Sequence, residues 1–555
     1  MAFTATTQWD VRTTGSDTNG GGFDTSSSGT DYSQQDAAQI TYTDLVIDAA
    51  ANTKCTSAAN PFTASHVGNV INITSGTGFT VQRVQVVSVA AGAATCDKSL
   101  GTLSSTGGNG KLGGGLATIN AALTLAISSN GIHIKAGTYT VTASLNIATV
   151  LTLSGYGLVH NDLGTKPLIT TATNSVDLWN VTANTQPVFI NLSLSNTAST
   201  RAKGVVRTGG FSGYWTFYKC LFDGFTNGIY NESGGGYSSI DSIYVAACEL
   251  KNCTDWAIIS RSEISVIGCS IHHNGKGVQG AEHTTFERSI IWSNSGDGYS
   301  FGYKNSGTVI VLSSTFANNG GDGLDIGAPF IMHFANNLIY GNTLFGVTAS
   351  GTLTWQIWFN AYGGNGSGNV NSFARLGYSP VILTANPFTN AGAGDFSLNS
   401  TAGGGAACKD AGYPGVFPGG NTTGHLDIGA AQSAGSSGTD PWATALPGAY
   451  TPGQAGYILG NRLKIASNTV TNTALNNFAF VMVDLTGTPR TGLTVTAQRS
   501  IDGGAYAACT NSVVEISNGT YKINLSGTDL NGTVITLRFT ATGAQDRLIT
   551  LVMNP

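Results

Sequence analysis

The 555-residue sequence is poor in charge and in segments that would direct a chain to a membrane. Asp, Glu, Lys and Arg make up only 10% of the residues, against ~25% in an ordinary globular domain. The 25 basic and 30 acidic residues give a net charge of -5, and no run of Lys or Arg occurs. A nucleic-acid binder needs such a basic patch. No stretch approaches the ~18 apolar residues of a membrane span. We therefore expect neither a nucleic-acid partner nor a membrane partner.

Cysteine and export signals are also scarce. Residues 1–9 lack the basic and apolar regions of a signal peptide, so we expect synthesis and assembly in a cytoplasm. Eight cysteines are too few for a disulfide scaffold, and no CxxC pair suggests zinc. Cys55 and Cys96 could pair, or could be two independent buried thiols. No cofactor and no metal site is predicted.

Glycine, by contrast, is abundant, with 75 residues, and hydrophobic residues reach 41%. Together with many Ser, Thr and Asn residues, this composition is typical of strands joined by tight turns. One helix is predicted near residues 116–127, where Leu116, Ile119, Leu123 and Ile127 form a single apolar stripe. The sequence thus predicts an all-β protein with enough apolar residues for a large core.

An internal repeat extends from about residue 215 to 350. Its reference position, register zero, is occupied by Cys220, Cys248, Cys269, Ser289, Ser314 and Asn337. Two places on, every residue is apolar: Phe222, Leu250, Ile271, Ile291, Phe316 and Ile339. Five places on stand Phe225, Cys253, Asn274, Asn294, Asn319 and Asn342. Eight or nine places on stand Gly228, Ala257, Gly277, Gly298, Gly323 and Gly346.

The repeat predicts a solenoid. A period near 23 residues is too long for the hairpins of a sandwich, which recur every ~8–12 residues. Such a period suits one coil whose short strands stack in parallel on the previous coil. The residues two places after register zero then form one interior column. The asparagines can hydrogen-bond along the stack, and the glycines are expected to supply positive φ angles.

The helix and the segment after it carry a resemblance. A Gly-rich loop, a helix and residues 132–139 resemble the opening of right-handed parallel β-helix proteins of the pectate-lyase-like superfamily. Residues 386–388, 395–398 and 426–430 resemble the closing coils of that family, so the resemblance covers roughly residues 115–430. Residues 9–20 and 67–114 are similar to modules of tailed-bacteriophage β-helix proteins.

Four parts are predicted along the chain. Residues 1–110 form an N-terminal β-rich module, 111–432 a right-handed parallel β-helix, and 433–456 a linker. Residues 457–555 are similar to an immunoglobulin-like β-sandwich of phage structural proteins. Its strands are expected at residues 478–484, 493–500, 513–516, 521–525, 534–540 and 547–553.

The first candidates for chemistry are Asp297 and Asp322, each one residue before the glycine of its coil. Stacked strands would set them ~4.8 Å apart between backbones. Two carboxylates that close raise one another's pKa and could share a proton. Retaining glycosidases need ~5–5.5 Å between carboxyl groups. Lys276 holds the matching place one coil earlier, so an ordinary salt-bridge ladder is the alternative.

Three further groups of side chains are candidates. The densest polar cluster consists of His272, His273, Glu282, His283, Glu287 and Arg288. Within it, His273 and Glu282 are the weak acid–base candidates, although strand positions that face solvent are polar by default. Cys220, Cys248 and Cys269 share an inward register, as buried thiols or as a bridged pair. Trp358, expected to face outward, and Tyr362 are candidates for glycan binding.

The resemblance implies a structural component of a tailed-phage virion. We expect a surface-displayed β-helix spike, fibre or decoration protein on tail, neck or capsid that attaches to the host. Its expected partners are other virion proteins, further copies in a homotrimer, and a host-surface polysaccharide. The alternative is a polysaccharide depolymerase, a lyase or glycoside hydrolase that uses surface carboxylates. A bacterial adhesin is a third hypothesis, which an export signal would favour.

Overall fold

The computed structural model describes residues 3–553 except 161, 183–184, 208–212, 232–241, 262, 281–282, 303–306, 328–330, 351–353, 414–425 and 433–469. The chain forms two compact units, Met1–Gly435 and Ser436–Pro555. The predicted linker, residues 433–456, lies outside the described residues, as does Glu282. The finer domain boundaries stay predictions.

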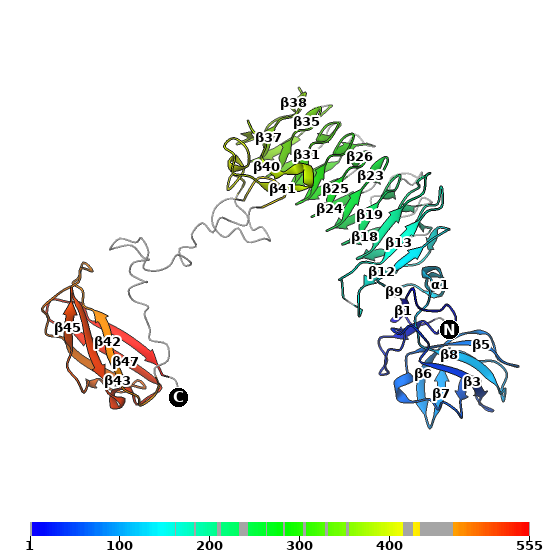
Figure 1. Cartoon of the computed structure of the whole chain (residues 1–555), viewed down its shortest axis with the longest axis horizontal. Helices are drawn as coiled ribbons and strands as arrows, with labels where there is room; N and C mark the ends of the chain where they lie inside the picture. The colour runs from blue at the N-terminus through cyan, green and yellow to red at the C-terminus, as the bar shows by residue number, and fades with distance from the viewer. Residues whose placement is uncertain are drawn as a thin grey trace. The chain divides into compact units, whose positions relative to one another are not determined.

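Most of the first unit is a solenoid whose stacked strands form three sheets along its length (Figure 1). The 12-stranded sheet has the order β2 (Gly22–Asp24), β1 (Thr7–Val11), β9 (Asn130–Lys135), β12 (Leu151–Tyr156), β15 (Val188–Ile190), β18 (Tyr214–Tyr218), β21 (Ser242–Ala246), β24 (Glu263–Ile267), β27 (His283–Glu287), β30 (Thr308–Leu312), β33 (Ile331–Ala335), β36 (Thr354–Trp358). The 11-stranded sheet has the order β10 (Thr138–Thr140), β13 (Leu168–Thr171), β16 (Ser193–Asn196), β19 (Leu221–Asp223), β22 (Glu249–Lys251), β25 (Ser270–His272), β28 (Ile290–Trp292), β31 (Thr315–Ala317), β34 (Leu338–Tyr340), β37 (Ala361–Gly363), β39 (Val381–Ile382). The 10-stranded sheet has the order β11 (Leu145–Ile147), β14 (Trp179–Val181), β17 (Val205–Arg207), β20 (Ile229–Asn231), β23 (Trp256–Ser260), β26 (Lys276–Gly280), β29 (Tyr299–Phe301), β32 (Leu324–Asp325), β35 (Phe345–Thr348), β38 (Gly368–Val370).

The chain visits the three sheets in turn, and from β9 to β38 successive coils pair in parallel. Strand β19, for example, pairs in parallel with β16 before it and with β22 after it. This topology is the predicted parallel β-helix. Its predicted interior column is confirmed, because Phe222, Leu250, Ile271, Ile291, Phe316 and Ile339 are in register and fully buried.

An asparagine ladder runs along one corner of the coils. Asn274 Nδ2 donates to Asn294 Oδ1 at 2.9 Å, and Asn294 Nδ2 donates to Asn319 Oδ1 at 3.0 Å. The ladder continues through Asn342 and Asn365 at 2.9 and 3.0 Å. Each amide also donates to a backbone carbonyl of an earlier coil. The predicted stacking of these asparagines is confirmed.

A second ladder occupies register zero. The backbone N–H of Cys269 donates to Ser289 Oγ at 3.2 Å, and that of Ser289 donates to Ser314 Oγ at 3.3 Å. The N–H groups of Ser314 and Asn337 donate to the side-chain oxygens of Asn337 and Asn360 at 2.9 and 2.8 Å. Small polar side chains at register zero therefore bind the backbone of one coil to the next.

Positive φ angles recur at two corners of each coil, but not at the predicted glycines. One set directly precedes register zero: Lys219, Ala247, Gly268, Arg288, Ser313, Asn336 and Phe359. The other lies four places after it: Gly224, Asn252, His273, Ser293, Asn318, Gly341 and Gly364. The predicted glycines have another role. A Cβ on Gly277 would lie 2.0 Å from the carbonyl oxygen of Gly298 on the next coil. Close approach of coils, not a left-handed backbone, requires glycine there.

The helix α1 (Ile119–Leu125) is shorter than the predicted 116–127. Thr118 caps it by accepting the N–H of Ala121, and Asp17 accepts the N–H groups of Ala117 and Thr118. The helix packs its buried Ile119 against the first coil. It covers that end of the β-helix, as the resemblance implies.

A closed antiparallel barrel follows β2 and precedes α1. Its strands, in order around the barrel, are β3 (Ile40–Ile47), β4 (Lys54–Thr56), β7 (Ala93–Cys96), β6 (Gln82–Ala90), β5 (Val70–Ser75) and β8 (Gly108–Leu112), with a short 3-10 helix η1 (Ala64–His66). The barrel has its own core, which includes the free thiols of Cys55 and Cys96. Strand β1 pairs in parallel with β9, so it belongs to the β-helix although it precedes the barrel.

Residues 384–413 and 426–432 fold back over the outer face of the 11-stranded sheet. They contribute the hairpin β40 (Phe388–Asn390) and β41 (Asp395–Leu398) and the turns η2 (Ala391–Ala393) and η3 (Gly405–Ala407). Phe388 and Phe396 join Trp292 and Leu338 of the sheet in one apolar cluster. The Trp292 and Phe396 ring centroids lie 5.1 Å apart. The described residues of this segment reach as far back as Trp292 in β28.

The second unit contains two antiparallel sheets around one core. Their strands are β42 (Leu475–Val481), β46 (Thr520–Leu525) and β45 (Val514–Ser517) in one sheet, and β44 (Ala507–Ala508), β43 (Thr496–Ile501), β47 (Val534–Thr540) and β48 (Arg547–Val552) in the other, with η4 (Gly527–Leu530) between β46 and β47. All six predicted strands are present. Within the described residues, no helix is both long and apolar enough to cross a bilayer.

Candidate functional site

The predicted aspartates lie on adjacent coils, and both carboxylates bind backbone. Asp297 Oδ1 accepts the N–H of Asp322 at 2.9 Å, and Asp322 Oδ1 accepts the N–H of Phe345 at 2.7 Å. Each carboxylate therefore caps a backbone donor of the following coil. Such bonds stabilise the ionised carboxylate and the stack together. The two carboxylates therefore help to hold their own coils to the coils that follow.

The charge environment of this pair differs from the predicted salt-bridge ladder. Burial raises the pKa of Asp322, and the neighbouring charge of Asp297 adds to the effect. Burial likewise raises the pKa of Asp325, which also faces both carboxylates. Lys276 Nζ lies 4.8 Å over the Trp256 ring and makes no ion pair with Asp297. The salt-bridge alternative is therefore wrong, because the lysine stacks on an aromatic face instead.

The predicted histidine cluster is divided between two sheets. His272 Nε2 in β25 donates to Glu249 Oε1 at 3.2 Å, and the His272 ring stacks on Trp292, with ring centroids 4.6 Å apart. Burial lowers the pKa of His272, and Glu249 partly offsets this. His283 and Glu287 belong to β27 of the 12-stranded sheet. The described members of the cluster thus lie on two different sheets, and its acid–base role stays a prediction.

His273 lies in a polar groove of about 710 Å³ at the corner after the 11-stranded sheet. Arg201 Nη1 donates to the Asn252 carbonyl and Asn252 Nδ2 donates to Asp223 Oδ1, both at 2.8 Å. His273 has a φ of 55°. It stands four places after register zero, and the residue at that place has a positive φ in each coil from the one with Phe222 to the one with Tyr362. Its place in the groove therefore follows from the coil geometry.

The aligned cysteines are free and buried. The backbone N–H of Cys220 donates to Cys248 Sγ at 3.3 Å, and Cys269 Sγ donates to the Val245 carbonyl at 3.3 Å. Burial raises the pKa values of Cys220 and Cys248 above the ordinary range. Thiols held protonated are poor nucleophiles. They fill the same ladder position that serine and asparagine take in later coils.

A buried ionic network that the sequence did not predict ties the first coils together. Asp10 is fully buried in β1, and its carboxylate accepts Arg12 Nε at 2.6 Å, the Tyr156 hydroxyl at 2.5 Å and His160 Nε2 at 2.8 Å. Arg12 also donates to the Tyr156 hydroxyl at 3.1 Å. The alternation of Asp10 and Arg12 along one strand was the available signal. Their partners lie about 150 residues away, which local patterns do not reveal.

His133 completes this network from β9. Its ring stacks on that of His160, with centroids 4.0 Å apart, and its Nε2 bonds Gln8 Oε1 at 2.9 Å. Burial, together with the neighbouring His160, lowers the pKa of His133 to about 4 against the opposing effect of Asp10. The network therefore holds a neutral imidazole and a paired carboxylate between β1, β9 and β12, where it stabilises the start of the β-helix.

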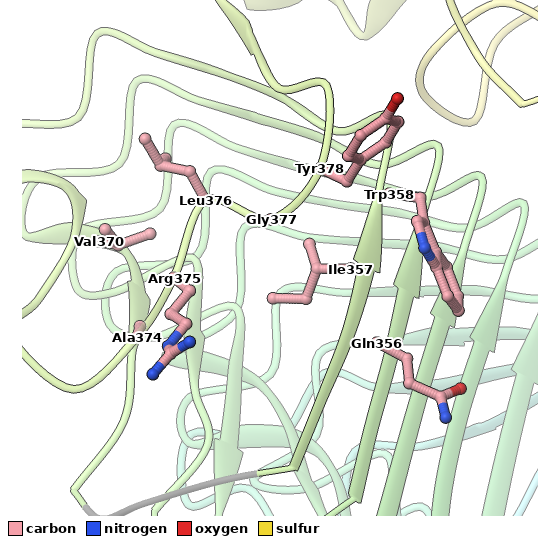
Figure 2. A pocket seen from close by; sticks show the side chains of 9 residues that line it. All are labelled: Gln356, Ile357, Trp358, Val370, Ala374, Arg375, Leu376, Gly377 and Tyr378. Atoms are coloured by element: carbon pink, nitrogen blue, oxygen red, sulfur yellow. The ribbon is translucent and has the colours of Figure 1, made fainter.

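The two aromatic candidates, Tyr362 and Trp358, differ in burial: the first lies in the interior and the second is exposed. Tyr362 is fully buried and continues the interior column after Ile339. It cannot stack on a surface sugar, because it stands two places after Asn360, the next register-zero residue. Trp358 faces outward as predicted and is 39% exposed. Together with Tyr378 and Arg375 it lines a pocket of about 660 Å³. In Figure 2 the Trp358 side chain projects from one side of β36, and Arg375 lies on the other side of that strand.

No group of three or more His, Cys, Asp or Glu side chains in the described ranges is arranged to hold a metal ion. The described residues form the polar groove at His273, the pocket at Trp358, and a pocket of about 480 Å³ between the start of α1 and residues 138–145. The groove is lined by side chains that bond one another. The pocket at Trp358 combines exposed aromatic rings with a cation.

A comparison with protein families agrees with this fold. The family model described as "Right handed beta helix region" matches residues 204–360. With the strand pairing, this match defines a right-handed parallel β-helix. Among solved structures, the chain is similar to pectate lyase Pel9A, with 14% identity, a TM-score of 0.36, and coverage of 57% of this chain and 91% of that chain. It is also similar to the periplasmic alginate epimerase AlgG, with 14% identity, a TM-score of 0.27, and coverage of 46% and 77%. No curated protein matches the chain.

Proposed function

We propose that this chain is a structural component of a tailed-phage virion. In this proposal it is a surface-displayed β-helix on tail, neck or capsid that attaches to host-surface glycans. The interior column and the two ladders support a stiff arm, since every coil is bonded to the next. The resemblance of the N-terminal segments to phage modules supports the virion location.

One contrast supports binding over cleavage. In Asp297 and in Asp322, one carboxylate oxygen accepts a hydrogen bond from a backbone N–H of the next coil. Trp358 and Tyr378, in contrast, stay exposed beside a pocket of ligand size. A surface that presents aromatic rings but engages its acids internally suits glycan contact without hydrolysis or elimination. The depolymerase hypothesis depends on carboxylates that reach a substrate.

Display would multiply weak contacts. We propose that the chain assembles as a homotrimer and that its second unit is an immunoglobulin-like module. Two antiparallel sheets of three and four strands around one core support the latter. Several copies on one particle convert weak sites into high avidity. Light scattering of the purified full chain measures the oligomeric state, and a monomer would contradict the trimer.

Two experiments test the proposal. A reconstruction of purified particles should locate the β-helix on the virion surface, and absence of the chain from particles would refute the virion role. Incubation of the full chain with host polysaccharide should yield no new reducing ends and no unsaturated sugars. Product formation that is abolished by Asp297→Asn or Asp322→Asn would instead establish the depolymerase.

A further inference from the structure

The 11-stranded sheet has an open edge at its first strand, β10. Among the described strands, β10 has one neighbour in the sheet, β13. The corresponding edges of the other two sheets are covered. Strands β1 and β2 extend the 12-stranded sheet beyond β9, and the helix α1 packs against β11 of the 10-stranded sheet. The start of the β-helix is therefore closed on two sheets and open on the third.

The backbone of β10 presents hydrogen-bonding groups at this edge. The N–H of Leu168 in β13 donates to the Gly137 carbonyl, and the N–H of Val141 donates back to β13, both at 2.8 Å. In a parallel pair, alternate residues of a strand bond to the same neighbour. The odd-numbered residues of this segment therefore face β13. The N–H and C=O groups of Thr138 and Thr140 consequently point away from β13, toward the open edge.

A pocket of about 480 Å³ lies beside β10. It is lined by residues 138–145, by residues 117–120 at the start of α1, and by Thr13. Its buried lining residues are apolar or aromatic: Ile119, Tyr139, Val141 and Leu145. Its exposed lining residues are small or polar, with Thr138, Thr140 and Thr142 in a row. No lining residue carries a charge. The open edge thus combines free backbone groups with an apolar floor and a threonine rim.

We infer that this edge binds an extended segment of a partner protein, which adds a further strand to the 11-stranded sheet. Unpaired N–H and C=O groups on an edge strand bind another strand through its backbone. Every strand of this sheet from β13 to β37 is paired on both sides, so the added strand would continue an interface that the sheet already repeats. Strand β10 has no proline and no charged residue, the residues that commonly protect an edge from pairing.

The pocket also determines the chemistry of the segment. Because no lining residue is charged, a charged side chain buried there would lose its hydration without gaining an opposite charge. Small β-branched residues hold an extended backbone and fit a rim of threonines. The partner segment is therefore uncharged and rich in Thr and Val. The inference goes beyond the proposed glycan contact and does not depend on it.

Fluorescence anisotropy with a labelled peptide tests the inference. The probe copies residues 167–174, which contain β13, the strand that already pairs with the other edge of β10. It should bind the full chain with a Kd below about 1 mM. Two N-methylated forms are the matched controls, one modified at residues 168 and 170 and the other at residues 169 and 171. Since alternate residues of a bound strand face β10, one form should bind and the other should not.

Variants of the full chain locate the binding edge. Thr140→Pro removes an N–H that faces the open edge and leaves the hydrogen bonds to β13 in place, so the affinity for the probe should fall about fivefold or more. Thr140→Val keeps that N–H and should bind as the parent does. Hydrogen exchange of the parent chain gives a readout that needs no variant. The amides of Thr138 and Thr140 should exchange rapidly in the chain alone and become protected when the probe is added.

Four results would overturn the inference. Equal binding of the two N-methylated forms, or unchanged exchange at residues 138–140, would exclude strand addition at β10. Absence of probe binding at about 1 mM would reject the site. In light scattering, growth of the particles with chain concentration that is lost in Thr140→Pro would replace the partner protein by a second copy of the chain. The virion role is decided separately by the particle reconstruction.

Discussion

Asn319→Ala should be among the most damaging single substitutions in the β-helix, although it removes no charge and little apolar surface. Asn319 is fully buried in the middle of the asparagine ladder. Its Nδ2 donates to the Ile291 carbonyl and to Asn342 Oδ1 at 3.2 and 2.9 Å. Its Oδ1 accepts the backbone N–H and the Nδ2 of Asn294 at 3.2 and 3.0 Å.

The expected cost follows from those four hydrogen bonds. Each is worth about 1 kcal/mol net, and their former partners would remain buried without replacement, so the loss is about 4 kcal/mol. Unfolding entropy is about 2.1 cal/mol/K per residue. For the unit Met1–Gly435, dividing the loss by the summed entropy gives a fall in Tm of roughly 4 °C.

Differential scanning calorimetry of the full chain measures this fall, and hydrogen exchange locates it. Peptides around Asn294 and Asn342 should lose protection first, because stability in a stacked repeat is local. Asn318→Gly is the matched control, since Asn318 is exposed and has a φ of 56° that glycine tolerates. A change in Tm below about 1 °C for Asn319→Ala, with unchanged protection, would refute the ladder as a source of stability.

Three further predictions concern single groups. His133 has its pKa lowered to about 4 from 6.5, so the unfolded chain takes up its proton first and stability falls between pH 6.5 and about 4. The loss should reach roughly 3 kcal/mol, and His133→Gln should flatten that part of a pH-dependent denaturation profile. Burial raises the pKa of Asp322, so its stabilising effect is present below pH ~3.8 and is lost as the pH rises. Asp322→Asn should therefore raise Tm at pH 7 but not at pH 3, and an equal shift at both would contradict the charge argument. Ala247 has a φ of 52°, so Ala247→Gly should stabilise the protein by about 0.5–1 kcal/mol, whereas Ala246→Gly in strand β21 should destabilise it.

The solenoid could be predicted because its physics repeats. Phe222 and its counterparts recur at one register, and a column of apolar residues needs a neighbouring coil to cover it. The asparagine ladder follows from the same period. The prediction that Tyr362 is a surface aromatic is wrong, because Tyr362 stands two places after Asn360, as Ile339 does after Asn337, and is buried in the interior column.

The remaining features depend on contacts that no local pattern contains. Asp10 meets His160 across 150 residues, and Tyr378 pairs with Trp358 through a non-repeating turn. The sequence predicts a positive φ at Gly277, but glycine is required there because the neighbouring coil is too close for a Cβ atom. The identity of such residues is determined by contacts between segments that are distant in the sequence, and these contacts are seen only in the folded structure.

The insertion of the barrel has a mechanical consequence. Because β1 pairs with β9, the chain leaves the first coil, forms the barrel and returns to the same coil. The barrel is therefore joined to the β-helix by two segments of chain instead of one. Tension applied to the barrel would be divided between the paired strands β1 and β2 on one side and the segment that leads through α1 to β9 on the other.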